Sequence, residues 1–588
     1  MKRCIFILAL FLSLCLQAQQ VEPTWESLNQ RGYPQWFSDA KLGIFVHWGL
    51  YSVPAYAGKE GYGEWFYRGL MTGDADRKRI MSLYADTTLP TFEQYKTLTN
   101  HWHGELWNPQ EWARVFREAG ARYVVLVTKH HDGYSLWDDP YQPEWNSVVS
   151  GPKRNIVEEL TTAVRNEGLR MGFYYSLPEW TNPRHIWMQN PDSTIGDYVD
   201  NYMVPQFKEL VSHYKPSLIF ADGDWQNNAE QFHSQELIAW YYNLVGPDAI
   251  VNDRWGNSTQ HGFKTPEYSA GINVSDRPWA ECRGLGRSFG LNRNEDLAGY
   301  LTSTELIQHF CELVAHGGGL TLNVGPYADG TIPLLQQERL CDLGHWLQVN
   351  GEAIYGTHPY CTPCQRKLFS SPMPPTKQID YDWVRNAPLK GMPVDNFDIH
   401  WHGTLTIPVE GVYEILGDYG AWFSGDHLMV VRNGTDTLPC IDLNPGEATN
   451  YYAKREKGYT CDLDVYYHEH DLEARVSLKV DGISWETGTE IPPLDIDWQG
   501  IASWERTLRC FTTKGDDLYV IEFERPNQTL TIPDMPRLKK GTAITLLGTT
   551  GKVKWEQTKD GTLTLDLSTL DPKELNALDH AWVFRIEK

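Results

Sequence analysis

Residue types suited to catalysis stand at the ends of several short apolar runs in the first half of the chain. His47 follows the first run, the pair His130 and His131 follows the second, and Asp222 ends a later run directly before a glycine. The other residues of this kind at the ends of such runs are Tyr174, Tyr175, Asp253 and Arg254. Successive runs that all end in ionisable or aromatic side chains are hard to explain as core filling, so they indicate one functional site.

Carboxylates are the side chains that best account for a reaction at this site. The chain has no phosphate-binding GxxxxGK[ST] sequence, no dinucleotide fingerprint and no GxSxG elbow. Hydrolysis of a glycosidic bond needs two carboxyl groups, one that attacks or activates water and one that protonates the leaving oxygen. Asp222, on a glycine turn among aromatic residues, is the candidate for the first role. Glu267 and Glu281 are candidates for the second, and Glu64 beside Trp65 is a third nearby carboxylate.

A metal-dependent hydrolase is an alternative interpretation of the same residues. Zinc is bound by histidine, cysteine and carboxylate side chains. The residues that could supply such a set are His47, His130, His131 and Asp222.

The elements that must position these residues alternate between strand and helix from residue 41 to residue 355. Strands are expected at 42–46, 123–128, 169–175, 217–221, 249–252 and 320–324. Helices are expected at 109–119, 155–166, 198–213, 235–244, 304–315 and 333–349. Repeated βα units imply a parallel sheet with right-handed crossovers. The pattern predicts an α/β fold with a (β/α)8-type barrel, in which the carboxyl ends of all strands lie at one face; an open doubly wound sheet is the alternative.

The pattern changes after about residue 360, where helical periodicity is replaced by alternating segments rich in Pro, Gly and Thr. This change predicts β-sandwich modules after the barrel. Residues 1–18 have a basic start and an apolar core that is typical of a secretory signal peptide. The expected division is a signal peptide at 1–18, a catalytic barrel at 19–360, an inserted β-rich domain at 365–498 and a C-terminal β-sandwich at 499–588.

Composition limits the class of protein and its partners. The 588 residues carry a net charge of −24, which disfavours binding to nucleic acid or to an anionic membrane surface. Aromatic residues make up 13% of the chain, which suits sugar binding and ordinary cores alike. No run after the leader is long enough for a transmembrane helix.

The ten cysteines are too few for a disulfide scaffold. The lone pair Cys361 and Cys364 favours a buried thiol pair or a short disulfide over a zinc site. We therefore expect an exported, periplasmic or extracellular protein without a membrane span; a lipid anchor at Cys15 is disfavoured by the bulky residue before it.

Several motifs, in order, resemble the α-L-fucosidases, family 29 of the glycoside hydrolases. The resemblance covers about residues 25–358 and resumes near Trp504. It is carried by 42–52, 64–65, 123–137, 173–176, 216–225, 252–256 and 350–356. It implies a retaining, exo-acting enzyme that removes terminal α-L-fucose from a fucosylated glycan or oligosaccharide through a covalent intermediate on Asp222, with no cofactor. The residues that match those holding the sugar are His47, Glu64, Trp65, His130, His131, Arg254 and one of Tyr174 and Tyr175, of which Tyr175 is preferred.

The resemblance also bears on the sugar methyl group and on the acid/base. Trp65, Trp225 and Phe289 are expected to form an apolar wall for the methyl group, although one buried methyl is worth only about 1 kcal/mol. Glu267, in Thr-Pro-Glu-Tyr, matches the acid/base of one branch of the family. Glu281 is displaced by one residue from a Trp-Glu pair found in other members, because Ala280 stands in that place. This departure keeps a catalytically silent glycan-binding protein as an alternative.

The region 365–498 is only loosely similar to a PA14-type β-domain. Such domains often bind glycans, sometimes with calcium, and a spacer role is equally compatible with the sequence. Its ligand and the oligomeric state of the protein are left open.

Overall fold

The computed structural model describes residues 20–59, 61–185, 195–268, 276–384, 386–419, 426–434, 436–438, 449–470 and 474–587. The expected signal peptide at 1–18 lies outside these residues. The chain divides into two compact units, one made of residues 1–363 and 510–588 and the other of residues 364–509.

The first unit contains a parallel sheet of seven strands. Their order is β5 (Ile250–Val251), β4 (Leu218–Asp222), β3 (Arg170–Ser176), β2 (Tyr123–Lys129), β1 (Leu42–Val46), β7 (Gly319–Val324) and β6 (Ala280–Gly284). All neighbouring pairs are parallel. Nearly every residue of these strands is buried, which is expected of a parallel sheet covered on both faces.

Residues 263–268 complete the barrel between the two outer strands. Phe263 bridges to the end of β5, and Glu267 bridges to Cys282 in β6, both in the parallel sense. The backbone N–H of Phe263 donates to Val251 at 3.0 Å, and that of Cys282 donates to Pro266 at 2.9 Å. This segment thus occupies the eighth strand position, and the predicted (β/α)8-type barrel is confirmed. Neither this segment nor β6 was expected as a strand.

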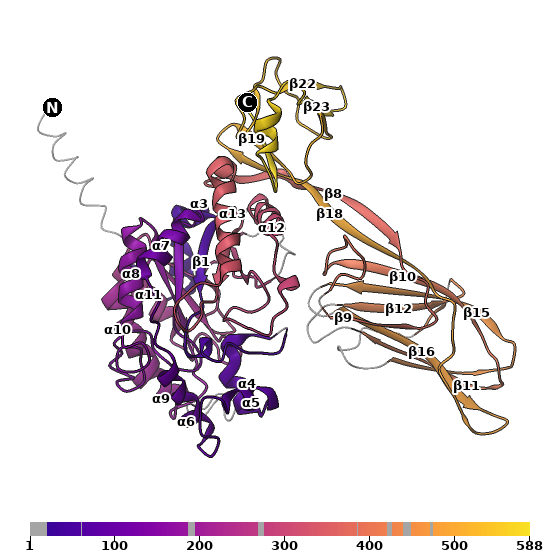
Figure 1. Ribbon diagram of the computed structural model, residues 1–588, viewed down its shortest axis with the longest axis horizontal. Coiled ribbons are helices and arrows are strands. Elements are labelled where there is room, and N and C mark those ends of the chain that lie inside the picture. The colour runs from indigo at the N-terminus through magenta and orange to yellow at the C-terminus, as the bar shows by residue number, and fades with distance from the viewer. Residues whose placement is uncertain are drawn as a thin grey trace, which may run out of the picture. The chain divides into compact units, whose positions relative to one another are not determined.

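Helices lie outside the strands, as the βα pattern predicted (Figure 1). They are α7 (Pro109–Glu118), α8 (Ile156–Asn166), α10 (Val204–Tyr214), α11 (Ser234–Val245), α12 (Ser303–Ala315) and α13 (Leu334–Asn350). The sequence fixes several helix starts through side-chain caps. Asn108 and Asn155 accept hydrogen bonds from the first turns of α7 and α8, and Thr302 with Glu305 forms a capping box at α12.

The first unit also contains an antiparallel β module at the C-terminus. Its strands include β19 (Asp517–Glu522), β20 (Thr529–Ile532), β21 (Ile544–Leu546), β22 (Lys554–Gln557), β23 (Leu563–Asp566) and β24 (Trp582–Ile586). They enclose an apolar core of their own.

The second unit is built from antiparallel strands whose residues alternate between buried and exposed. Examples are β10 (Phe397–Thr406), β11 (Gly411–Tyr419), β15 (Thr460–Glu469) and β16 (Ala474–Ser484). Strands of two sheets contribute to one buried cluster, so the unit is a β-sandwich. The expected pairing of Cys361 with Cys364 is wrong, because Cys361 is a free, exposed thiol whereas Cys364 is disulfide-bonded. Among the described helices, none combines the length and apolar character needed to span a bilayer.

Candidate active site

A cavity of about 290 Å³ opens at the carboxyl ends of the barrel strands. This is close to the lower end of the range for ligand pockets, so it suits one small ring. Its lining consists of Phe45, His47, Tyr62, Glu64, Trp65, His130, Tyr174, Phe220, Asp222, Trp225, Arg254, Glu267, Cys282 and Phe289. Nine of the twelve residues predicted for the site line this cavity. His131 does not line it, but its Nε2 faces Oδ2 of Asp222, which does.

Asp222 is the best-supported carboxylate of the cavity. Its Oδ2 accepts a hydrogen bond from the Tyr174 hydroxyl at 2.7 Å and lies 3.3 Å from Nε2 of His131. Its Oδ1 lies 3.3 Å from Nη1 of Arg254. Burial alone would raise the pKa of Asp222, but the hydrogen bond with His131 and the charge of Arg254 outweigh it and hold the pKa well below its usual range. Asp222 is therefore ionised at neutral pH, as an attacking carboxylate must be.

The glycine after Asp222 allows a close turn that a larger residue would disturb. Gly223 has a φ of +96°, and a Cβ added there would lie 2.3 Å from Cδ of Pro178. We expect Gly223→Ala to destabilise the protein by about 1–2 kcal/mol from backbone strain, and by more through this clash. Because Pro178 accepts a hydrogen bond from His131, kcat should fall as well. Gly168→Ala is the matched control, since Gly168 also has a positive φ of +76° but free space around its Cβ. Thermal unfolding and turnover of both variants would check this, and equal losses in the two would contradict it.

His47 and His130 are buried and face the cavity as neutral rings. Burial lowers the pKa of His47 to about 4, and it lowers the pKa of His130 well below its usual value. Nδ1 of His47 lies 2.6 Å from Oδ1 of Asn323, whose amide nitrogen donates to the carbonyl of Phe289. This arrangement makes Nδ1 the protonated nitrogen of His47, so its Nε2 can accept a hydrogen bond from a ligand hydroxyl. Nδ1 of His130 is buried without a hydrogen-bond partner among the described residues.

Glu64 adds a buried carboxyl group to the wall. It lies in a short 3-10 helix, η2 (Gly63–Trp65), and its Oε2 accepts a hydrogen bond from the N–H of Gly290 at 2.7 Å. Burial outweighs this bond and raises the pKa of Glu64 to about 8. At neutral pH the group is mainly protonated and can donate a hydrogen bond. The neighbouring Trp65 packs on Trp225, with ring centroids 5.6 Å apart.

Arg254 connects the two predicted catalytic carboxylates. Its Nη2 lies 3.1 Å from Oε2 of Glu267, while its Nη1 faces Asp222. Oε1 of Glu267 accepts a hydrogen bond from the Tyr62 hydroxyl at 2.8 Å. One guanidinium group therefore holds both carboxylates close to each other.

The structure puts Tyr174 in the cavity, and not Tyr175 as preferred from the sequence. Side chains of a strand alternate between its two faces. Tyr174 points to the inside of the barrel and reaches Asp222, whereas Tyr175 points outward and its hydroxyl donates to Oε1 of Gln206 at 2.6 Å. Tyr175 is consequently part of the packing between β3 and α10.

Glu281 also faces away from the cavity. It is fully buried in β6, with its Oε2 2.5 Å from Nε2 of His309 in α12. The inward-facing neighbour is Cys282, which lines the cavity. Of the two candidate acid/base residues, only Glu267 therefore reaches the site.

Phe289, Trp65 and Trp225 all line the cavity. Phe289 packs against Phe45 and Tyr62, with centroids 6.4 and 5.6 Å away. The cavity residues that the sequence did not reveal are Phe45, Tyr62, Phe220 and Cys282. Tyr62 is two residues before Glu64, and this spacing was the one signal that could have identified it.

Among the described residues, no group of three histidine, cysteine, aspartate or glutamate side chains is arranged to hold a metal ion. The predicted set was His47, His130, His131 and Asp222. In the structure His47 faces Asn323, and Asp222 faces His131 and Arg254.

Comparisons with known proteins agree with this geometry. The family model Alpha-L-fucosidase matches residues 9–352, and the model Alpha-L-fucosidase C-terminal domain matches residues 506–587. An alpha-L-fucosidase of Dictyostelium discoideum is 39% identical over 366 residues, which are 60% of this chain and 78% of the relative. The plasma alpha-L-fucosidase of Homo sapiens is 37% identical over 352 residues, 58% of this chain and 73% of the relative. A solved alpha-fucosidase of Thermotoga maritima, in complex with fucose, has 28% identity and a TM-score of 0.63 and covers 96% of this chain and 99% of its own.

Proposed function

Because this chain belongs to the α-L-fucosidase family of glycoside hydrolases, we propose that it removes terminal α-L-fucose with retention of configuration, with Asp222 as nucleophile and Glu267 as acid/base. The observation that carries this proposal is the pair of carboxylates held by one arginine. Arg254 lies 3.3 Å from Asp222 and 3.1 Å from Glu267. Retaining glycosidases need carboxyl groups about 5–5.5 Å apart, and a shared guanidinium is compatible with such a separation.

In the first step, the ionised carboxylate of Asp222 attacks the anomeric carbon as the glycosidic C–O bond breaks. The proton of Glu267 goes to the leaving oxygen, and an ester joins the sugar to Asp222. In the second step, Glu267 takes a proton from water, and the water oxygen displaces Asp222 from the anomeric carbon. The ester removes the negative charge of Asp222, whereas Nη2 of Arg254 still lies 3.1 Å from Oε2 of Glu267.

The cavity favours a single terminal sugar. Its volume of about 290 Å³ leaves room for one ring, which supports exo action. Neutral His47 and protonated Glu64 offer an acceptor and a donor to hydroxyl groups, and the aromatic rings offer apolar surface to the methyl group. Such hydrogen bonds carry most of the selectivity, since an analogue lacking the matching hydroxyl leaves buried polar groups unpaired.

The stereochemistry of the first product tests this mechanism. We expect proton NMR of the reaction mixture to show α-L-fucose before the β anomer, which then appears by mutarotation. Double displacement at the anomeric carbon is the reason, because two inversions restore the starting configuration. Initial release of β-L-fucose would exclude Asp222 as a covalent nucleophile. Absence of any product from 4-nitrophenyl α-L-fucoside would favour the silent glycan-binding alternative.

A further inference from the structure

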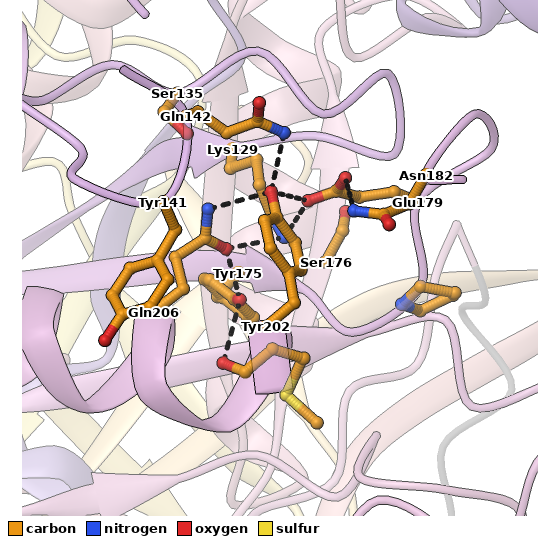
Figure 2. A network of polar contacts seen from close by, with 12 residues as sticks. Lys129, Ser135, Tyr141, Gln142, Tyr175, Ser176, Glu179, Asn182, Tyr202 and Gln206 are labelled. Carbon is orange, nitrogen blue, oxygen red and sulfur yellow. Dashed lines mark hydrogen bonds and ion pairs between the residues drawn. The ribbon is translucent and has the colours of Figure 1, made fainter. Parts of the chain in front are cut away.

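A buried polar network joins side chains near the ends of β2 and β3 to Gln206 of α10 (Figure 2). At its centre, Nζ of Lys129 lies 2.7 Å from Oε1 of Glu179, and the two side chains are only 0% and 2% exposed. Lys129 is the last residue of β2, and Glu179 follows β3. Neither side chain lines the cavity, so a direct contact with the sugar does not explain them.

The network gives each buried charge several partners. Nζ of Lys129 also lies 3.1 Å from Oε1 of Gln206 and 4.2 Å from the ring centre of Tyr175. The carboxylate of Glu179 accepts further hydrogen bonds from the Tyr202 hydroxyl at 2.8 Å and from the amide of Asn182 at 3.0 Å. Burying an ion pair costs more than burying apolar residues of the same size. A pair saturated in this way therefore fixes geometry more than it adds stability.

The chain neighbours of the ion pair are the groups that hold His131. Nδ1 of His131 lies 3.0 Å from the carbonyl oxygen of Pro178, and the N–H of Trp180 donates to the carbonyl of His131 at 2.7 Å. The Trp180 ring also stacks on His131, with centroids 5.4 Å apart. Glu179 lies between Pro178 and Trp180, so the ion pair ties the strand end that carries His131 to the segment that holds its ring and backbone.

His131 in turn contacts the proposed nucleophile. Its Nε2 lies 3.3 Å from Oδ2 of Asp222, and its Nδ1 faces the carbonyl of Pro178. Both of these oxygens are acceptors, so only the imidazolium form can donate to both. The position of the ring between them decides whether Asp222 receives this hydrogen bond.

We propose that Lys129 and Glu179 are positioning residues, whose buried ion pair holds His131 between Pro178 and Asp222. This role rests on the proposed function, since it acts on the attacking carboxylate. Its effect is exerted on Asp222 through His131, and neither Lys129 nor Glu179 lines the cavity.

The test compares Glu179→Gln with Glu281→Gln in the full-length enzyme, using 4-nitrophenyl α-L-fucoside. Glu281 is an equally buried barrel carboxylate, but it is paired with His309 away from the cavity. Misplacement of a ring by about 1 Å can cost about 100-fold in rate, so we expect a loss of this size in kcat for Glu179→Gln, with a smaller change in KM.

The acid limb of kcat/KM should move to higher pH in Glu179→Gln, because Asp222 loses the hydrogen bond from His131 while Arg254 and Tyr174 remain. Glu281→Gln should lower the Tm alone. Wild-type kcat and acid limb in Glu179→Gln, or the same shift in both variants, would overturn the proposal.

A double variant controls for the possibility that Glu179→Gln loses activity because it misfolds. Glu179→Gln leaves the charge of Lys129 buried without its carboxylate, whereas Lys129→Gln with Glu179→Gln removes both charges. The double variant should regain Tm but keep the low kcat and the shifted acid limb. If it shows wild-type kinetics, the ion pair has no positioning role.

A crystal structure of the double variant separates this proposal from the proposed function. We expect the His131 ring to leave Pro178 or Asp222. If the ring moves and the wild-type protein hydrolyses no fucoside, the proposed function fails, although the ion pair is still shown to hold the His131 ring. If the ring keeps both contacts, the positioning role is wrong, whatever the activity of the wild type.

Discussion

Replacing Asp222 with alanine is expected to reduce kcat on 4-nitrophenyl α-L-fucoside by roughly 10⁴-fold or more, because removal of a covalent nucleophile abolishes the low-energy path. The leaving group of this substrate needs little protonation, so the loss reports the attack itself. The measurement is the steady-state rate of nitrophenol release by purified variant and wild type. Asp224→Ala is the matched control, since Asp224 is two residues away and does not line the cavity.

The fold of the Asp222→Ala variant should survive, which makes its inactivity informative. Arg254 keeps Glu267 as a partner at 3.1 Å, and Tyr174 keeps Ser176 at 2.9 Å. Added azide gives a second readout. It can enter the space of the missing carboxylate and attack the anomeric carbon directly, and a single inversion then produces β-L-fucosyl azide. Residual activity near the wild-type level, or an equal loss in Asp224→Ala, would exclude Asp222 as the nucleophile.

The barrel could be predicted from the sequence wherever local patterns and tertiary packing agree. The first strand was expected at 42–46, and β1 has these bounds. Residues 263–268 escaped prediction because they join the sheet by isolated bridges and contain Pro266, which cannot donate to a ladder. β6 escaped because its Glu281 is buried against His309, a partner that lies 28 residues further along the chain.

The strand ends in the sequence were enough to predict which residues meet at the candidate site. They were not enough to predict which side chains of a strand point into the barrel. A parallel barrel brings the carboxyl ends of its strands to one face, so His47, His130 and Asp222 were predicted to meet. The choice between Tyr174 and Tyr175 depends on which residue points inward, and both are aromatic. No apolar-polar alternation distinguishes them, since a strand buried on both faces carries apolar residues on each. Glu281 was misassigned for the same reason, because its inward neighbour is the uncharged Cys282.

Replacing Glu267 with alanine is expected to affect the two steps of the reaction differently. On 4-nitrophenyl α-L-fucoside the first step should continue, since nitrophenolate leaves without a proton. The second step should slow by roughly 10²–10⁴-fold, because water loses its general base. Azide should restore turnover, since it is anionic and needs no base. A fucosylated oligosaccharide, with its poor leaving group, should be hydrolysed at a comparably reduced rate and should not be rescued by azide.

The configuration of the azide product identifies the carboxylate that was removed. In Glu267→Ala the azide attacks a sugar already attached to Asp222, so two inversions give α-L-fucosyl azide, the opposite anomer from that expected of Asp222→Ala. Glu281→Gln is the control, since the side chain of Glu281 contacts His309 away from the cavity. The turnover of this variant should not depend on azide. A burst of nitrophenol should precede the slow steady state in Glu267→Ala and disappear when azide is added. Rescue of Glu281→Gln by azide, or formation of β-L-fucosyl azide by Glu267→Ala, would assign the acid/base role to another residue. Formation of α-L-fucosyl azide by Glu267→Ala alone would assign the role to Glu267, the carboxylate that shares Arg254 with the nucleophile.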